Sequence, residues 1–279
     1  MGRTITLWIA TILLLGLLSG LVLAKDGKGG RANSAKMPKG WYTKSVALVV
    51  GIDNYKNKWQ PLEKAVFNAK QMETELKRQG FQVTTLLDEQ ATKSEILRQL
   101  ATVLPKEVGP NDRFVFYFAG QSQDERQGEG RDIVSYLIPA DGSREFGDLW
   151  FSYLSLPEVR TALKKYRARH VLAIFDACFL DLLPIKRPFG PCDSMESCLP
   201  KQGLMLINSG FGVGHCQEGL FTSAVLTALQ GDADKDRDGY VTFREMESYA
   251  QWLVGSANLR QTPGGEVWIG DGQMLFNHR

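Results

Sequence analysis

The sequence has few histidines and no excess of charge of either sign. Only three of its 279 residues are histidine, so few positions can supply an imidazole as a catalytic base. Lys and Arg together number 33 against 31 for Asp and Glu, which leaves a net charge of +2. A nucleic-acid-binding face usually needs clustered basic residues. We therefore expect no nucleic-acid partner.

Cysteine is also scarce, with four residues and no CxxC motif. This pattern disfavours a structural zinc site, because only His215 lies near a cysteine, Cys216. Cys192 and Cys198 bracket a short loop that contains Pro and Ser, and they are the best candidates for a disulfide. Spacing alone does not determine which cysteines pair.

The first 40 residues have a composition of their own. Arg3 precedes an apolar run over residues 7–23, small or aliphatic residues follow, and then Lys25. This order is typical of a secretory signal peptide, and the run is also long enough for a membrane anchor. We expect a signal peptide over residues 1–24 in preference to an anchor, and a flexible linker over residues 25–40. Either alternative places the domain at 41–279 outside the cytoplasm, as a secreted, periplasmic or membrane-anchored protein.

From Trp41 onwards, short apolar runs alternate with segments that have helical periodicity. The continuous apolar runs are typical of strands buried on both faces, and the spacing of three and four between apolar residues predicts helices with one buried face. Strands are predicted over residues 46–50, 81–87, 114–118, 171–175 and 204–207, and helices over residues 62–76, 92–104 and 156–168. Thr92 and Glu95 predict a capping box. The alternation predicts an α/β fold with a mostly parallel sheet covered by helices.

Two predicted strands end in residues that can carry chemistry. The fourth strand is followed by Asp176, Ala177 and Cys178, and the third by Gly120, Gln121 and Ser122. Reactive groups collect at the carboxyl ends of parallel strands. Cys178 is therefore either an exposed nucleophile that needs a neighbouring base or a buried free cysteine that packs as a small hydrophobic residue.

Several ordered segments resemble the caspase-like cysteine peptidases, in particular the bacterial orthocaspases and the metacaspases. The resemblance covers about residues 44 to 275, and its blocks lie at 47–55, 62–69, 80–83, 116–120, 136–141, 176–179 and 220–222. It implies a caspase-like α/β/α sandwich with a mostly parallel central sheet of about six strands. It also implies a cysteine endopeptidase that cleaves after Arg or Lys, with Cys178 as the nucleophile.

The sequence departs from that family at several positions around the expected site. The catalytic histidine falls on Gln121, which has no titratable proton near neutral pH, and the oxyanion-hole glycine falls on Ser122. One of two acidic residues that would bind a substrate Arg or Lys falls on Asn68, whereas the other is retained as Asp176. The Ser-Gly pair expected after the cysteine block is Leu180 and Asp181.

No other histidine is a good replacement for the base. His170 begins the strand that ends before Cys178, so the strand's rise of about 3.3 Å per residue separates the two. His278 lies at the C-terminus, and His215 follows the fifth strand, where a loop histidine is usually just solvated.

A second motif, over residues 234–245, matches the calcium loop of an EF-hand. Such a loop has oxygen ligands at alternate positions, glycine at position 6 and glutamate at position 12. The predicted ligands are Asp234, Asp236, Asp238, Tyr240 through its carbonyl, Thr242 and Glu245. Helical patterns over residues 221–229 and 243–253 flank the loop. The alternative is an Asp-rich turn before a helix, and we favour calcium.

The leading hypothesis is an exported caspase-like pseudopeptidase that binds a peptide or protein partner, including one with basic residues, and has a calcium-binding loop. The first alternative is an active endopeptidase that cuts after Arg or Lys with an unrecognised base. The second is a calcium-stabilised structural protein of the envelope.

Overall fold

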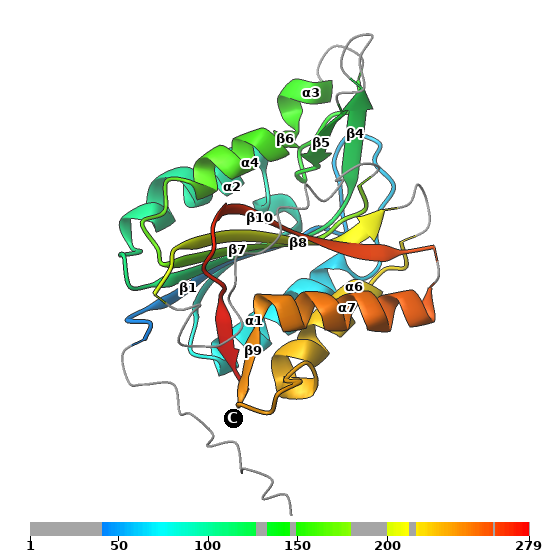
Figure 1. Ribbon diagram of the computed structural model, residues 1–279. Coiled ribbons are helices and arrows are strands. Elements are labelled where there is room, and N and C mark those ends of the chain that lie inside the picture. Colours follow the sequence, from blue (N-terminus) through cyan, green and yellow to red (C-terminus); the bar gives the residue numbers. More distant parts are fainter. Residues whose placement is uncertain are drawn as a thin grey trace, which may run out of the picture. The chain divides into compact units, whose positions relative to one another are not determined.

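The central element is a six-stranded sheet (Figure 1). In a computed structural model, the strand order is β10-β8-β7-β3-β1-β2, and only β10, paired to β8, runs antiparallel. The strands are β1 (Ser45–Gly51), β2 (Gln82–Leu87), β3 (Arg113–Ala119), β7 (His170–Asp176), β8 (Gly203–Phe211) and β10 (Thr262–Gly270). The predicted α/β fold with a mostly parallel sheet of about six strands is confirmed.

The structure describes residues 41–126, 133–145, 149–179, 200–211, 216–258 and 260–278. The predicted signal peptide or anchor (residues 1–24) and linker (residues 25–40) lie outside this range, as do His215, Leu180, Asp181 and the pair Cys192 and Cys198. Within the described residues, no helix is both long enough and apolar enough to cross a membrane.

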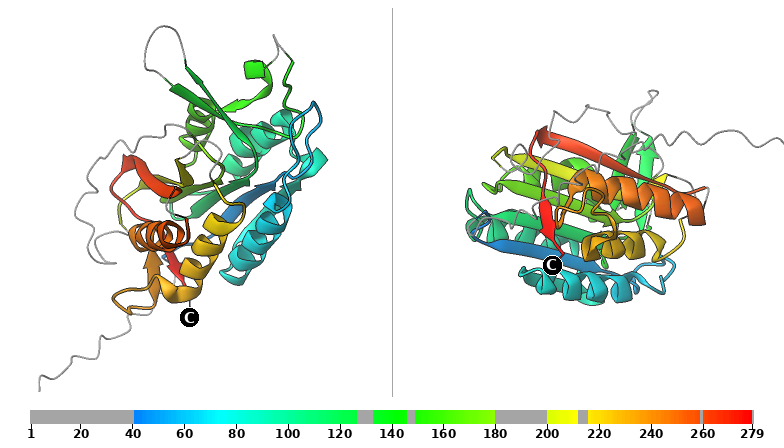
Figure 2. Two further views of the ribbon diagram at one scale, coloured as in Figure 1. Left: turned by 90° about the vertical axis from the view of Figure 1, so that its right-hand side faces the viewer. Right: turned by 60° about the horizontal axis from the view of Figure 1, so that its bottom comes forward.

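Helices cover both faces of the sheet, as two views of the molecule show (Figures 1 and 2). One face carries α2 (Lys93–Arg98) and α4 (Leu156–Leu163). The other carries α1 (Ala65–Arg78), α6 (Leu220–Thr227) and α7 (Phe243–Ala257). Side chains alternate along each strand: Leu48 and Phe116 pack in the first layer, and Val49 and Tyr117 pack in the second. Burial on both faces explains why the strands read as continuous apolar runs.

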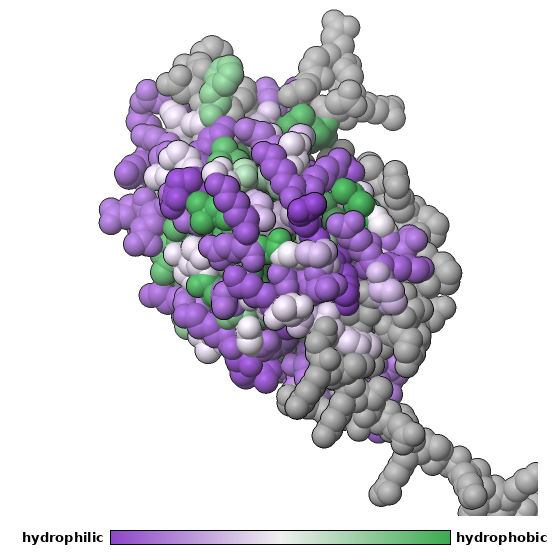
Figure 3. Space-filling model, turned by 90° about the vertical axis from the view of Figure 1, so that its left-hand side faces the viewer, coloured by the Kyte–Doolittle hydropathy of each residue, from purple (hydrophilic) through white to green (hydrophobic). Residues whose placement is uncertain are grey.

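The described apolar side chains on one face of the molecule are dispersed. On the face shown in Figure 3, the described apolar residues form separate patches with polar residues between them. Such scattered exposure is normal for a protein surface.

One helix start and one capping contact differ from the predictions. The first helix begins at Ala65, three residues after the predicted start at Leu62, because a carboxylate oxygen of Asp53 accepts hydrogen bonds from the backbone N–H groups of Ala65 (2.7 Å) and Val66 (3.2 Å). Thr92 does cap α2 by accepting from the N–H of Glu95. The Glu95 carboxylate accepts from Arg98 and Gln99 in place of completing the predicted capping box.

Several short strands lie outside the predicted pattern. A small antiparallel sheet contains β4 (Ser122–Arg126), β5 (Ile133–Leu137) and β6 (Leu154–Ser155), near the short helix α3 (Leu149–Ser152), and β9 (Tyr240–Thr242) pairs with β11 (Leu275–Asn277). The edge strand β10 was also missed. Its sequence contains Pro263, Gly264 and Gly265, a composition typical of turns that an edge strand tolerates.

Candidate functional site

A cavity of about 390 Å³ lies at the carboxyl ends of β3 and β7. Its walls come from α1, the start of β4, the turn after β7 and the loop before α6. The predicted site residues Asn68, Gln121, Ser122, Asp176 and Cys178 all line it. The volume is within the range of small-ligand sites, and it suits one or two side chains of a peptide. Sequence reasoning thus selected residues that the fold brings together.

The turn after β7 is held by two serine hydroxyls. Ser209, on β8, donates its hydroxyl to the carbonyl of Ala177 at 2.8 Å. Ser122, the first residue of β4, donates its hydroxyl to the carbonyl of Cys178. A glycine at position 122 has no side chain with which to make this bond. The two bonds fix the backbone that presents Cys178 to the cavity.

Cys178 forms a disulfide with Cys216, and their Cα atoms are 6.1 Å apart. Cys216 lies in the loop before α6, both cysteines are half-buried, and both line the cavity. The expectation that Cys178 is a free cysteine, either reactive or buried, is therefore wrong. The error arose because partners 38 residues apart cannot be paired from spacing. The favoured Cys192–Cys198 pairing lies outside the described residues and stays a prediction.

Gln121 is held by hydrogen bonds to residues after β1. Its backbone N–H donates to the Tyr55 hydroxyl at 2.7 Å, and its side-chain amide donates to the carbonyl of Gln60 at 3.2 Å. Space for a side chain at position 120 is tight, because a Cβ there would lie 2.7 Å from the Tyr55 hydroxyl oxygen. Tyr55 therefore supports the backbone of the turn after β3, a role that no local sequence pattern predicts.

Asp176 lies in a hydrogen-bond network with three other side chains. Its Oδ2 accepts from the Asn68 amide at 3.1 Å and from the Thr222 hydroxyl at 2.5 Å, and Thr222 also bonds the Tyr117 hydroxyl. Burial raises the pKa of Asp176 to about 6, against the lowering effect of the Thr222 and Asn68 hydrogen bonds and with a further contribution from the charge of Glu218. The carboxylate is thus partly satisfied within the protein, which weakens its attraction for a ligand cation.

Glu218 is a site residue that the sequence analysis missed. It lines the cavity, and its Oε2 accepts from the N–H groups of Glu63 and Lys64, just before α1. It therefore connects the loop that carries Cys216 to the helix that carries Asn68. Its neighbour Gly219 has a φ of 81°, which glycine adopts without strain. The sequence signal was slight: a Glu-Gly pair shortly before a helix.

The described histidines lie away from the cavity. His170 is at the opposite end of β7, as predicted, where its ring nitrogens lie 2.5 Å from the Tyr42 hydroxyl and 2.9 Å from the Lys201 carbonyl. The Nε2 of His278 lies 2.8 Å from Oδ2 of Asp234. Within the part of the chain that the structure describes, no imidazole lines the cavity beside Cys178.

Comparison with known proteins agrees with this architecture. A family model described as a caspase domain matches residues 44–206, more than half of the chain. The chain belongs to the caspase-domain family. This match confirms the resemblance and, together with the sheet order, the caspase-like fold.

A solved structure supports the fold of this caspase domain. The chain is similar to protein GSU0716 from Geobacter sulfurreducens, with a TM-score of 0.57 and 17% identity over 80% of this chain and 93% of that chain. At this identity the likeness concerns the fold alone. No curated protein is similar enough to match the chain.

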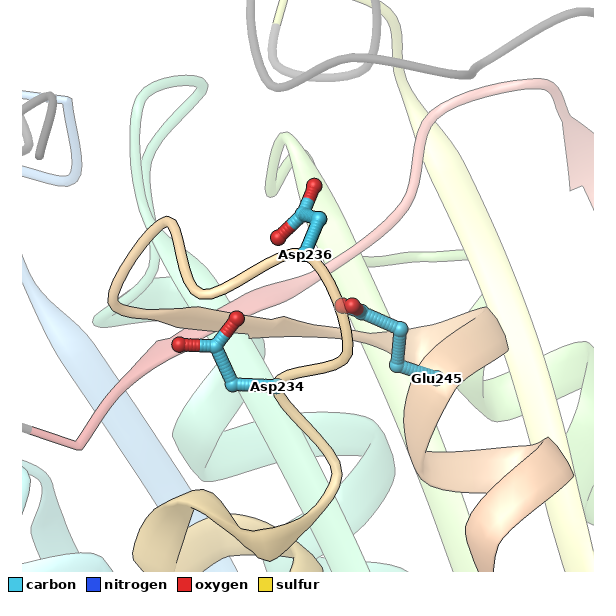
Figure 4. Close-up of side chains that lie close together, drawn as sticks. All are labelled: Asp234, Asp236 and Glu245. Atoms are coloured by element: carbon cyan, nitrogen blue, oxygen red, sulfur yellow. The ribbon is translucent and has the colours of Figure 1, made fainter. Parts of the chain in front are cut away.

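The predicted calcium loop lies beyond the matched range, between α6 and α7. Carboxylate oxygens of Asp234, Asp236 and Glu245 lie within 4.8 Å of one another (Figure 4). The loop turns at Gly239, which has a φ of 94° and donates its N–H to Oδ2 of Asp234 at 2.9 Å. These three carboxylates are close enough together to share one hard cation.

The other predicted ligands have local roles. Asp238 accepts from the N–H of Tyr240 at 2.8 Å. Burial raises the pKa of Asp238, and the charges of Asp236, Asp234 and Glu245 raise it further. Thr242 and Glu245 form a reciprocal capping box at the start of α7. The loop thus has the features of the Asp-rich turn before a helix that the sequence offered as an alternative.

His278 contacts this loop and was not predicted to do so. Burial would raise the pKa of Asp234, but hydrogen bonds from His278 and from the Gly239 backbone outweigh it and lower the pKa. Gly231 is required beside the imidazole, because a Cβ there would lie 2.5 Å from Nδ1 of His278. The β9–β11 pairing brings residue 278 to this position, and such a long-range pairing leaves no local signal in the sequence.

Proposed function

We propose that this caspase domain is a pseudopeptidase that binds a peptide or protein partner in the cavity at the ends of β3 and β7. The observation that carries the proposal is the disulfide between Cys178 and Cys216. A sulfur that is bonded to another sulfur has no thiolate to attack a carbonyl. The residue at the nucleophile position is therefore not a nucleophile in this state.

The surroundings of Cys178 support the same conclusion. Hydrolysis of a peptide bond needs a group that takes the thiol proton and returns it to the leaving amine. Gln121 lines the cavity where the family's histidine is expected, and its amide cannot perform that transfer. Opening the disulfide alone would thus not restore efficient hydrolysis.

Peptide binding is supported by the retained cavity. Asp124, Asp176 and Glu218 line it with carboxylates, and Leu62, Ala65 and Phe179 line it with apolar groups. This mixture suits a peptide with a neutral or basic side chain. Because Asn68 already donates to Asp176, we expect a basic residue to be tolerated and only moderately preferred.

We also propose that the loop at residues 234–245 binds calcium and stabilises the α6–α7 region. Calcium binding by this loop is supported by the closeness of the Asp234, Asp236 and Glu245 carboxylates and by the turn at Gly239. A site of this kind suits the higher calcium concentrations outside cells, where dissociation constants of about 0.1 to 1 mM are typical.

Export is the third part of the proposal. The apolar segment at residues 7–23 has the pattern of a signal peptide or anchor. The Cys178–Cys216 disulfide is in keeping with export, because disulfides persist in oxidising compartments.

The test uses the unreduced protein and fluorescent peptides that end in Arg or Lys, with and without calcium. We expect binding by anisotropy and no release of the reporter group. Turnover that is lost in Cys178→Ala would establish the active endopeptidase instead. Calcium binding without affinity for any peptide would favour the structural envelope protein.

A further inference from the structure

The disulfide lies in the wall of the proposed peptide-binding cavity, where a bound partner can reach it. Both cysteines are half-buried and line the cavity. We propose that the Cys178–Cys216 pair is a thiol–disulfide exchange site that captures a cysteine-bearing peptide segment as a mixed disulfide. This inference rests on the peptide binding proposed above and adds a covalent step at the same place.

The chemistry fits a site that lacks a base. In peptide hydrolysis the leaving amine must be protonated, whereas in disulfide exchange the leaving group is a thiolate, which is stable without a proton donor. The partner's thiolate attacks one sulfur of the pair, and a new S–S bond forms. The Cys178–Cys216 bond breaks, and its electron pair stays on the released sulfur, which takes a proton from water. No net oxidation or reduction occurs.

The two cysteines are held in place by contacts that do not depend on their bond. Hydroxyls of Ser209 and Ser122 hold the carbonyls of Ala177 and Cys178. On the other side, the N–H of Gln217 donates to the side chain of Gln261 at 3.0 Å. Glu218 is bonded to the backbone before α1. The released cysteine therefore stays close to the mixed disulfide and can displace the partner, which makes capture reversible.

Charge selects the partner. Carboxylates of Asp124, Asp176 and Glu218 line the cavity, and the Lys64 side chain passes near Gly219 at its edge. The three carboxylates repel an attacking thiolate, and a basic residue beside the partner's cysteine offsets that repulsion. The partner is therefore a peptide segment in which a cysteine is next to a basic residue. We expect such a cysteine to react faster than a cysteine that is next to an acidic residue.

The experiment uses the wild-type protein, purified without reductant, and three blocked synthetic peptides. One contains a single cysteine next to arginine, the second replaces the arginine by glutamate, and the third replaces the cysteine of the first by serine. The reaction is stopped with acid and N-ethylmaleimide, and the adducts are mapped by mass spectrometry. We expect the arginine peptide to be disulfide-bonded to Cys178 or Cys216 and the other cysteine of the pair to be alkylated by N-ethylmaleimide. The arginine peptide should form its adduct about tenfold faster than the glutamate peptide.

Control variants assign the outcome. The double variant Cys192→Ser/Cys198→Ser should retain both exchange and binding of the serine peptide, and Cys216→Ser should lose exchange. Binding of the serine peptide without any adduct from the cysteine peptides would overturn the exchange and leave peptide binding intact. No binding of the serine peptide would overturn the proposed function itself. Adducts confined to Cys192 or Cys198, or equal rates for the two cysteine peptides, would also overturn the inference.

Discussion

The side-chain amide of Asn68 donates to Oδ2 of Asp176 at 3.1 Å. The two residues come from α1 and the end of β7, 108 positions apart, and both line the cavity. In the caspase-like resemblance both positions are acidic and receive a basic substrate side chain. Here one position has a neutral amide that donates to the other's carboxylate, so this pair carries less negative charge and is less selective for cations than two carboxylates would be.

The first prediction concerns the pH dependence of stability that Asp176 creates. Its pKa in the folded protein is raised from 3.8 to about 6, so the folded state binds more protons than the unfolded state between these values. Its contribution to the free energy of unfolding therefore falls as the pH rises from about 4 to about 6, and stays low above that. The isosteric Asp176→Asn keeps an oxygen acceptor for Asn68 and Thr222 and removes the ionisation.

Urea unfolding of both proteins at pH 4 to 8 measures this effect. We expect the stability of Asp176→Asn relative to the wild type to increase by about 1 to 3 kcal/mol between pH 4 and pH 6. All other ionisable groups are common to the two proteins and cancel in the difference. A difference that does not change with pH would show that Asp176 is not held in its protonated form.

The second prediction concerns the substitution Asn68→Asp. It removes the amide that donates to Asp176 and places a second carboxylate beside it. We expect it to raise the pKa of Asp176 further, because two like charges disfavour ionisation. At pH 8 we expect it to strengthen binding of an arginine-ended peptide by about tenfold. Anisotropy titrations measure the affinity, and the same peptide with alanine in place of arginine is the control. Equal gains for both peptides would contradict an electrostatic cause.

The third prediction concerns the packing of Tyr55 on Gly120. A Cβ at position 120 would lie 2.7 Å from the Tyr55 hydroxyl oxygen, so we expect Gly120→Ala to destabilise the fold by about 1–3 kcal/mol. Tyr55→Phe removes that oxygen, and we expect it to reduce the cost of Gly120→Ala in the double variant. Denaturation of the four proteins gives the coupling free energy. Additive effects would mean that the turn moves away from Tyr55.

The sheet could be predicted because its strands are buried on both faces. Ala47 and Leu48, for example, face opposite helix layers and are both fully buried, so the strand is a continuous apolar run in the sequence. The edge strand β10 has no such run. Its pairing with β8 depends on an edge position that tolerates Pro263.

The site could be predicted only in part. The family motifs identified Cys178, Gln121 and Asp176 as neighbours, because they lie at the carboxyl ends of the adjacent parallel strands β3 and β7. The partners that connect them come from distant segments: Cys216 and Glu218 from the loop before α6, and Tyr55 from the loop after β1. These contacts depend on how loops converge in space, and no local pattern in the sequence encodes that convergence.

The fourth prediction concerns calcium. Binding to the folded state alone stabilises a protein by RT ln(1 + [Ca²⁺]/Kd). With a dissociation constant of about 0.1 to 1 mM, 10 mM calcium should add about 1.4 to 2.7 kcal/mol and raise the Tm by a few degrees. Glu245→Gln should remove most of this rise. Glu89→Gln, the same change at an exposed residue, should retain it. Differential scanning calorimetry measures the Tm, and an equal rise in both variants would place the calcium elsewhere.

The fifth prediction concerns two of the features that separate this site from a working peptidase, the glutamine at position 121 and the Cys178–Cys216 disulfide. Gln121→His supplies an imidazole at the position expected for the base, but Cys178 remains bonded to Cys216. We therefore expect this single variant to be inactive without reductant. Gln121→His/Cys216→Ser frees the thiol as well, and it should cleave an arginine reporter at a measurable rate, although below that of an active peptidase because Ser122 and Asn68 are unchanged.

Turnover of the reporter is measured for the wild type, both single variants and the double variant, each with and without dithiothreitol. Reductant should activate the single variant Gln121→His. It should have no effect on the double variant, because that variant has no Cys178–Cys216 bond to open. Cys216→Ser alone should stay inactive, because it still lacks a base. Activity in Cys216→Ser would mean that a base other than residue 121 serves Cys178. Inactivity of the double variant would mean that the changes at Ser122 or Asn68 also prevent catalysis.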